Sequence, residues 1–313
     1  MAQRFQGIRM SPHGFIVVPM RKSITRLIHI SAVILWLVAT GYHILAQGVR
    51  SDSARGYLER GASSMAKGEV DLALADFELA VASDPKLPDA WYNRAVARYC
   101  KSEFDEALSD LDQTIKLDPA HVLAWIKHGN VQMMRGLLEE AISDFTVAMR
   151  LKPGSVLAAN NRGLARQQMK DYAGARDDYE FALRLNDKHP LIYNNLGSVK
   201  HDLRDYVEAL AAYDRALKLK PTWAAAWCNR GLTKKAMGDF KGALADYDQA
   251  IKLKPDFALA YYNRSWVKRQ LRMGGDAEQD FETSLKLRAN ETKPEAAGCT
   301  EIQLEEAPLA RKP

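Results

Sequence analysis

Residues 224–257 read AAAWCNRGLTKKAMGDFKGALADYDQAIKLKPDF, and they decide the fold. In each half of this stretch, apolar and small residues recur every three or four positions, which is the period of a helix with one buried face. Between the halves, Gly238 suits the left-handed C-cap of the first helix and Asp239 suits the N-cap of the second. Pro255 lacks an amide hydrogen, so it ends the second helix. The stretch predicts two helices joined by a tight turn.

The same pattern occurs seven times without an insertion, from residue 54 to residue 291. In each unit a small residue is followed sixteen positions later by a large apolar residue. The small residues are Gly61, Ala95, Gly129, Gly163, Gly197, Gly231 and Ser265, and the large ones are Phe77, Leu111, Phe145, Tyr179, Tyr213, Tyr247 and Phe281. One helical hairpin cannot bury its apolar face alone, whereas stacked hairpins bury a continuous core.

The sequence therefore predicts an all-α solenoid of seven 34-residue helix-turn-helix repeats. The predicted units are 54–87, 88–121, 122–155, 156–189, 190–223, 224–257 and 258–291. In a chain of this kind, we expect function on an extended surface rather than in a catalytic pocket.

The run Trp227-Cys228-Asn229-Arg230-Gly231, followed by Ala243, Tyr247, Ala250 and Pro255, resembles the tetratricopeptide repeat (TPR) family. The resemblance covers residues 54–291 and implies a right-handed superhelix whose inside is lined by the first helix of each unit. It implies no particular partner, because this fold supports many functions.

Each unit except one also carries a basic residue and an acidic residue sixteen positions apart. The basic residues are Arg60, Arg94, His128, Arg162, Arg230 and Arg264, and the acidic ones are Asp76, Asp110, Asp144, Asp178, Asp246 and Asp280. The fifth unit has Leu196 and Ala212 at these positions, so it loses both charges together. We infer a recurring pair, either between the helices of one unit or between neighbouring units. If solvent reaches it, each pair contributes roughly 0–1 kcal/mol.

Asparagine dominates one position that helical geometry places on the free side of each first helix. The sixth position of the seven units reads Glu59, Asn93, Lys127, Asn161, Asn195, Asn229 and Asn263. Asparagine is a poor former of helix interiors, and its amide can both donate to and accept from a peptide backbone. The run resembles the asparagine array in the TPR superhelix of O-GlcNAc transferases, without their catalytic domain.

This pattern predicts a concave groove that holds an extended peptide. The predicted peptide-binding residues are Asn93, Lys127, Asn130, Asn161, Asn195, Asn229, Asn263 and Trp266. Leucines at nearby positions would supply an apolar floor, namely Leu123, Leu157, Leu164, Leu191, Leu232 and Leu259. In the alternative interpretation, the asparagines stabilise helix packing or were inherited by duplication of one unit.

The amino end, residues 1–49, has the order of an export segment. Arg21, Lys22 and Arg26 precede a mostly apolar run over 27–46, and Met1, Met10 or Met20 is the start. The run predicts either a signal peptide cleaved near Ala46 or a retained membrane-anchor helix. Both alternatives place the repeats outside the cytoplasm, either membrane-anchored or, after cleavage, periplasmic or secreted. Residues 292–313 lack periodicity and predict a polar, mobile tail.

Charge and motifs exclude several function classes. The net charge of +5 comes entirely from five basic residues within 1–46, so the rest of the chain is neutral and gives no signal for nucleic acid. The sequence has no phosphate loop, zinc motif or nucleophile elbow, so we expect no catalytic residue, no cofactor and no metal site. The leading hypothesis is a non-enzymatic protein-binding scaffold. The alternatives are a self-associating structural module, in which case a homo-oligomer forms, and an accessory subunit of an envelope enzyme.

Overall fold

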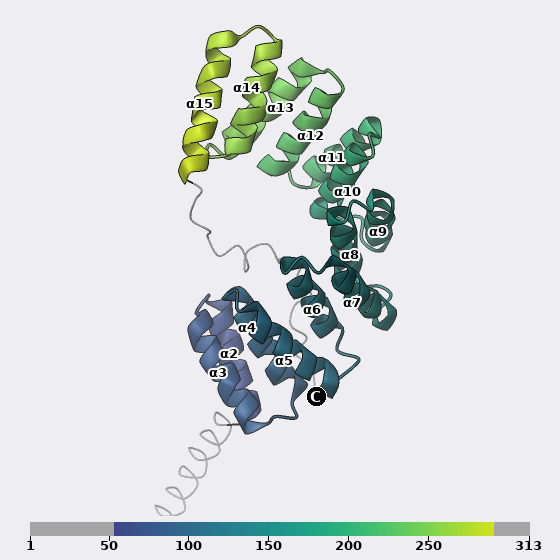
Figure 1. Cartoon of the computed structure of the whole chain (residues 1–313), viewed down its shortest axis with the longest axis vertical. Coiled ribbons are helices and arrows are strands. Elements are labelled where there is room, and N and C mark those ends of the chain that lie inside the picture. Colours follow the sequence, from purple (N-terminus) through teal and green to yellow (C-terminus); the bar gives the residue numbers. More distant parts are fainter. Residues whose placement is uncertain (1–52, 291–313) are drawn as a thin grey trace, which may run out of the picture.

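The computed structural model describes residues 53–290, and these residues form fourteen α-helices and no strand (Figure 1). The helices are α2 (Ala54–Ala66), α3 (Val70–Ser83), α4 (Pro88–Cys100), α5 (Phe104–Leu117), α6 (Val122–Met134), α7 (Leu138–Leu151), α8 (Val156–Gln168), α9 (Tyr172–Leu185), α10 (Pro190–Asp202), α11 (Tyr206–Leu219), α12 (Ala224–Ala236), α13 (Phe240–Leu253), α14 (Ala258–Gln270) and α15 (Gly274–Asn290). The predicted all-α repeat array is confirmed.

The turn inside each unit adopts the conformation that the sequence predicts. Gly238 lies at φ 83°, and the carboxylate of Asp239 accepts a hydrogen bond from the amide of Gly242 at 2.9 Å. The turn position equivalent to Gly238 has positive φ in all seven units. Four units place a residue other than glycine there, namely Ser102, Lys170, Arg204 and Arg272. The turn that ends the first helix therefore imposes a positive φ even on residues whose side chains disfavour it.

Close packing of the two helices in a unit explains the columns of small and large residues. A Cβ added at Gly129 would lie 2.7 Å from the ring of Phe145, which is fully buried. The same clash, at 2.5–2.9 Å, occurs between each of the other four helical glycines of this column and the aromatic ring of its unit. In the second unit the small residue is Ala95, and the large one is Leu111 rather than a ring. The volumes of the two columns are therefore matched in the first six units.

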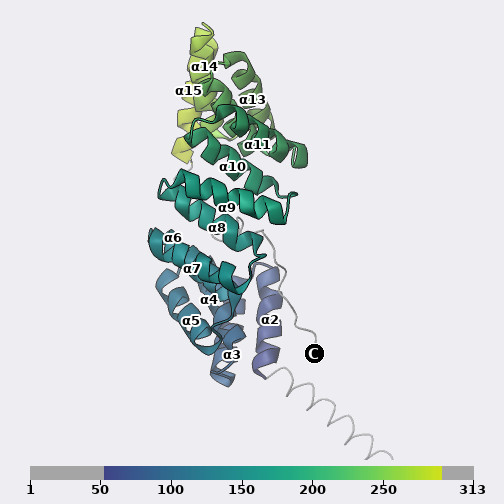
Figure 2. The same cartoon turned by 90° about the vertical axis from the view of Figure 1, so that its right-hand side faces the viewer.

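The array curves because its two layers are spaced differently. Consecutive first helices, such as α6 and α8 or α10 and α12, contact one another, while within residues 53–290 no such contact joins consecutive second helices. The first helices therefore form the tighter, inner layer. Figure 1 shows the units following an open arc from α2 to α15, and Figure 2 shows them stacked along the long axis.

The recurring charge pair lies inside each of the six units that carry it. In the third, sixth and seventh units the basic residue also reaches an aspartate of the unit before. Arg230 donates to Asp246 of its own unit at 2.6 Å and to Asp214 of the previous unit at 2.5 Å. Arg264 bonds Asp280 at 2.6 Å and Asp248 at 2.7 Å in the same manner. Of the two arrangements that the sequence leaves open, the structure therefore contains both. Arg230 and Arg264 thus each link two second helices whose backbones do not approach each other closely.

The acids of these pairs are more buried than the sequence suggests. Asp110 is 1% exposed and accepts from both Arg94 at 2.7 Å and Arg98 at 2.8 Å. Breaking a buried pair leaves an uncompensated charge, which costs ~3–5 kcal/mol rather than the surface value. The fifth unit replaces the pair with apolar contacts, because Leu196 and Ala212 lie in the same core cluster.

The predicted export segment, residues 1–49, and the predicted tail, residues 292–313, lie outside the described residues. Over residues 53–290, none of the helices has both the length and the apolar character needed to span a bilayer. The handedness of the superhelix, the anchor and the tail stay predictions.

The matched columns predict that Gly129→Ala lowers the stability of the wild type but raises the stability of a Phe145→Leu protein. Gly129→Ala alone overpacks the interface at a cost of ~1–3 kcal/mol, which outweighs a gain in helix propensity of ~1 kcal/mol. In a Phe145→Leu background the ring is gone, as in the second unit, so the same substitution is stabilising. Urea unfolding of the four proteins measures both effects. The explanation fails if Gly129→Ala changes stability equally in both backgrounds.

His128 predicts a stability that depends on pH. It lies 2.7 Å from Asp144 and 3.4 Å from Asp112, and although burial opposes the charge, these carboxylates raise its pKa above the ordinary value. Because the folded state then holds the proton more tightly, this stabilisation is full at low pH and is lost as pH rises through the folded pKa. His128→Arg, the residue of five other units, stays charged and removes the dependence.

The free energy of unfolding is therefore measured from pH 5 to pH 9 for both proteins. The difference between them is expected to grow with pH, with a slope of at most ~1.4 kcal/mol per pH unit for one proton. Subtraction of the two curves removes the contribution of the other histidines. One of these is His201, whose pKa is lowered by burial. A difference that stays constant with pH would contradict the assignment.

Candidate functional site

Asparagines of the sixth position lie on the first helices, which form the inner layer of the arc. Asn161 is on α8, Asn195 on α10 and Asn229 on α12, and all three are half-buried. Their neighbours at the seventh and eighth positions pack toward the second helices, as the Arg230–Asp246 bond and the Gly231–Tyr247 contact show. The geometry therefore brings these amides to the inner face, at one per unit.

These amides bond to the first helix of the preceding unit. Asn161 donates to Asn130 Oδ1 at 2.8 Å, Asn195 donates to Asn160 Oδ1 at 3.2 Å, and Asn229 donates to Asn194 Oδ1 at 3.0 Å. Asn160 in turn donates to Asn161 Oδ1 at 3.1 Å, so the amides of α6, α8 and α10 form a continuous chain. The bonds fix the orientation of each carboxamide.

The asparagines at the two ends are arranged differently. Asn93 donates to the backbone oxygen of Asp89, and Asn263 donates to the backbone oxygen of Leu259, each four residues earlier in the same helix. Asn263 is buried at 5% exposure and also accepts from Lys235 Nζ at 2.9 Å. Asn93 and Asn263 therefore lie outside the continuous chain of amides, and the eight predicted residues form no single network.

Lys127 occupies the asparagine position of the third unit and is buried at 8% exposure. Its ammonium lies 4.9 Å from the centroid of the Tyr99 ring of the preceding unit. Within residues 53–290 it makes no ion pair with a carboxylate, and burial lowers its pKa to about 8. Within residues 53–290, Lys127 therefore has no acidic partner, and the burial of its charge destabilises the folded state.

Trp266 lies at the C-terminal end of the inner face and is 41% exposed. The ammonium of Lys235 lies 5.3 Å from its ring centroid, and Phe240 packs against it edge-on at 5.7 Å between centroids. The ring is thus fixed in orientation while part of it faces solvent.

Sequence reasoning missed three residues of this surface. Asn160 and Asn194, at the fifth position, accept the bonds from the next unit, and Lys235 supports both Asn263 and Trp266. The doubled asparagines Asn160-Asn161 and Asn194-Asn195 were a signal for the first two. The role of Lys235 depends on the approach of α12 to α14, which no local pattern contains.

The amides of the inner face retain unused hydrogen-bond donors and acceptors. A carboxamide has two donor hydrogens and two acceptor lone pairs, and one bond across the helices uses only one of these. Each half-buried amide can still pair with the main chain of a bound segment. Within residues 53–290, no three or more histidine, cysteine, aspartate or glutamate side chains gather as metal ligands.

Comparison with solved structures shows the same fold in proteins of low sequence identity. A structure from a functional characterization of Pseudomonas aeruginosa PilF has 23% identity and a TM-score of 0.60, over 67% of this chain and 96% of that one. A tetratricopeptide repeat protein of Parabacteroides merdae has 18% identity and a TM-score of 0.63, over 76% and 94% of the two chains. The APC/C hetero-tetramer Cut9–Hcn1 matches with 23% identity and a TM-score of 0.60 over 71% of this chain, which spans 46% of that chain.

Family models described as tetratricopeptide repeat match residues 58–108, 92–156, 160–222 and 224–257. A comparison with curated proteins gives no match. The matched segments span more than half of the sequence and coincide with the units that the structure displays. The chain belongs to the tetratricopeptide repeat family.

Proposed function

We propose that this chain is a non-enzymatic scaffold that binds an extended peptide segment of a partner protein along its concave face. Tetratricopeptide repeats indicate a protein–protein interaction scaffold, and the concave groove is the finer part of the proposal. The observation that carries it is the set of half-buried amides of Asn161, Asn195 and Asn229, one per unit, each held by the previous unit.

Regular spacing suits these amides to a peptide backbone. An extended chain presents carbonyl and amide groups at regular intervals, and oriented carboxamides can pair with them independently of the side chains. Because neighbouring helices already fix the rotamer of each amide, binding loses less conformational entropy than it would with free side chains.

Leucines beside the amides give the surface its apolar component. Leu123, Leu157, Leu164, Leu191 and Leu232 are half-buried, and Leu259 is 45% exposed. A partner segment with some apolar side chains would cover them, while its backbone bonds to the amides. The expected partner is therefore a partly apolar extended peptide.

We further propose that the repeats act outside the cytoplasm, in an envelope or secreted complex. The support is the sequence order of residues 1–49, in which three basic residues precede a mostly apolar run. A signal peptide and a retained anchor both export the array, so the proposal holds for either.

Replacing three amides tests the groove. Asn161→Ala/Asn195→Ala/Asn229→Ala removes the backbone-pairing groups, and we expect at least tenfold lower recovery of partners in a crosslinked pull-down from native membranes. The loss of three cross-helix bonds costs ~0.5–1.5 kcal/mol each and is partly offset by the better helix propensity of alanine, so the fold is retained. Circular dichroism checks that both proteins are folded.

The matched control carries three alanines on exposed positions of second helices, Glu106→Ala/Glu140→Ala/Lys241→Ala. It should recover the same partners as the wild type. Equal recovery by the asparagine variant and the wild type would refute the proposed groove and leave the amides with a packing role.

Lys127→Met separates binding from stability. The ammonium is buried without a carboxylate and its pKa is lowered to about 8, so at pH 7 the charged form destabilises the fold. An apolar side chain of similar length removes this penalty, and we expect the protein to be ~1–3 kcal/mol more stable in urea unfolding. Since Lys127 lies on the proposed binding face, capture of partners should weaken at the same time. A variant that is destabilised would contradict this account of the lysine.

A further inference from the structure

The fifth position of the first helix is buried in the middle of the array and exposed at its end. Ile126, Asn160, Asn194 and Cys228 are each at most 8% exposed, whereas Tyr262 at the same position of the last unit is 42% exposed. The first helix of the following unit covers the inner residues, as the bond from Asn229 to Asn194 shows. Within residues 53–290, nothing covers Tyr262 in this way.

An apolar and cationic surface surrounds this tyrosine. We define the terminal patch as Tyr262, Arg269, Phe281, Leu285 and Arg288. The rings of Tyr262 and Phe281 are 6.3 Å apart between centroids, and Leu285 is 50% exposed. Phe281, Leu285 and Arg288 share one face of α15 because they are four and three residues apart. This side of the last helix is therefore not a polar face.

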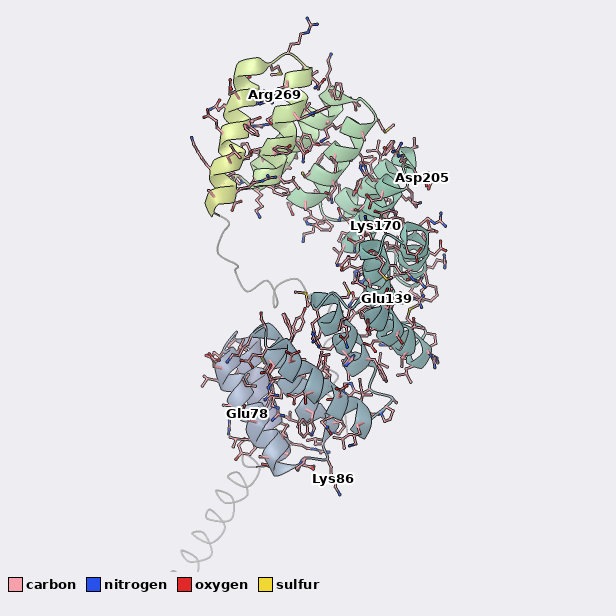
Figure 3. The ribbon with its side chains drawn as sticks, in the orientation of Figure 1. Glu78, Lys86, Glu139, Lys170, Asp205 and Arg269 are labelled. Carbon is pink, nitrogen blue, oxygen red and sulfur yellow. The ribbon has the colours of Figure 1, made fainter. Side chains whose placement is uncertain are left out.

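Both arginines of the terminal patch lie against rings rather than acids. The guanidinium of Arg269 is 5.5 Å from the Phe281 centroid, and that of Arg288 is 5.1 Å from the Tyr262 centroid (Figure 3 labels Arg269). Each of Arg230 and Arg264, by contrast, bonds two aspartates. No carboxylate within residues 53–290 pairs with either arginine of the patch. The surface therefore suits an occupant that is both acidic and apolar.

The sequence that follows α15 has this composition. Residues 294–310 read PEAAGCTEIQLEEAPLA, with four glutamates and no basic residue. Glu301, Glu305 and Glu306 flank Ile302 and Leu304, so acidic and apolar side chains lie next to each other. This segment complements the terminal patch in charge and in hydrophobicity.

The segment can also reach the patch. Glu301 is thirteen residues after Arg288, which is itself part of the patch. A chain of that length spans up to ~40 Å, and α15, with 17 residues, is ~26 Å long. A short tether gives an effective concentration of about millimolar, so weak complementarity is sufficient for occupancy.

We propose that residues 299–309 bind back onto the terminal patch of the same chain, with Ile302 and Leu304 against Tyr262, Phe281 and Leu285 and the glutamates facing Arg269 and Arg288. This contact covers the exposed end of the repeat core, which is the role that the next unit has elsewhere in the array. It concerns the end of the solenoid and does not depend on the proposed peptide groove.

Photo-crosslinking of the full chain tests the proposal. Benzoylphenylalanine in place of Leu304 should give crosslinks within one chain to Ala258–Gln270 or Gly274–Asn290, located by mass spectrometry of the monomer band. Arg269→Glu/Arg288→Glu turns attraction into repulsion, and we expect the crosslink yield to fall about tenfold. The control Arg272→Glu/Lys286→Glu makes the same charge change on exposed residues of the same unit outside the patch and should leave the yield unchanged.

A charge swap makes the result independent of folding. Adding Glu305→Arg/Glu306→Arg to the Arg269→Glu/Arg288→Glu protein should restore most of the crosslink, which a misfolded patch would not allow. Crosslinks mainly between two chains would assign the patch to a second copy and overturn the proposal. It would also be overturned by crosslinks elsewhere, or by a yield that does not respond to the charge reversal.

Discussion

Close approach of two helices at a small residue is the constraint on which the rest of this structure depends. The ring of Phe145 occupies space that a Cβ at Gly129 would need, and the same contact recurs at Gly61, Gly163, Gly197 and Gly231. Five of the seven units therefore share one packing contact between their two helices. Identical units can then stack with an identical step, and this produces a regular arc instead of an irregular bundle.

Charge pairs connect consecutive second helices. The backbones of consecutive second helices do not approach each other closely within residues 53–290, yet Arg230 and Arg264 each bond aspartates from two of them. A guanidinium suits this position because its planar fork can bond two carboxylates at once. The fifth unit shows that the linkage is replaceable, since Leu196 and Ala212 fill the same space with apolar packing. Unit shape thus depends on packing, and the paired charges add a link between second helices to the apolar clusters that already join neighbouring units.

The inner face carries the binding proposal because its polar groups are only partly used. Cross-helix bonds orient the amides of Asn161, Asn195 and Asn229 but leave hydrogen-bonding capacity on each. The two interpretations of the asparagines, packing and peptide binding, are therefore compatible, because the bond that packs the helices also positions the amide. Lys127 also fits a binding face better than a structural role, since its buried ammonium beside Tyr99 destabilises the folded state.

The sequence by itself determined the helices and the seven units, and it predicted a charge pair such as Arg230 and Asp246 without deciding whether that pair lies within one unit, because each follows from residues at fixed spacing along the chain. It also indicated which helix face is free, since a helix converts spacing into direction. Only the tertiary structure decided which asparagines bond to one another, that Arg230 also reaches Asp214, and that Tyr262 is left exposed while Asn194 is covered. These features depend on how far one unit is rotated against the next, and that rotation is the sum of many contacts between units that no local pattern records.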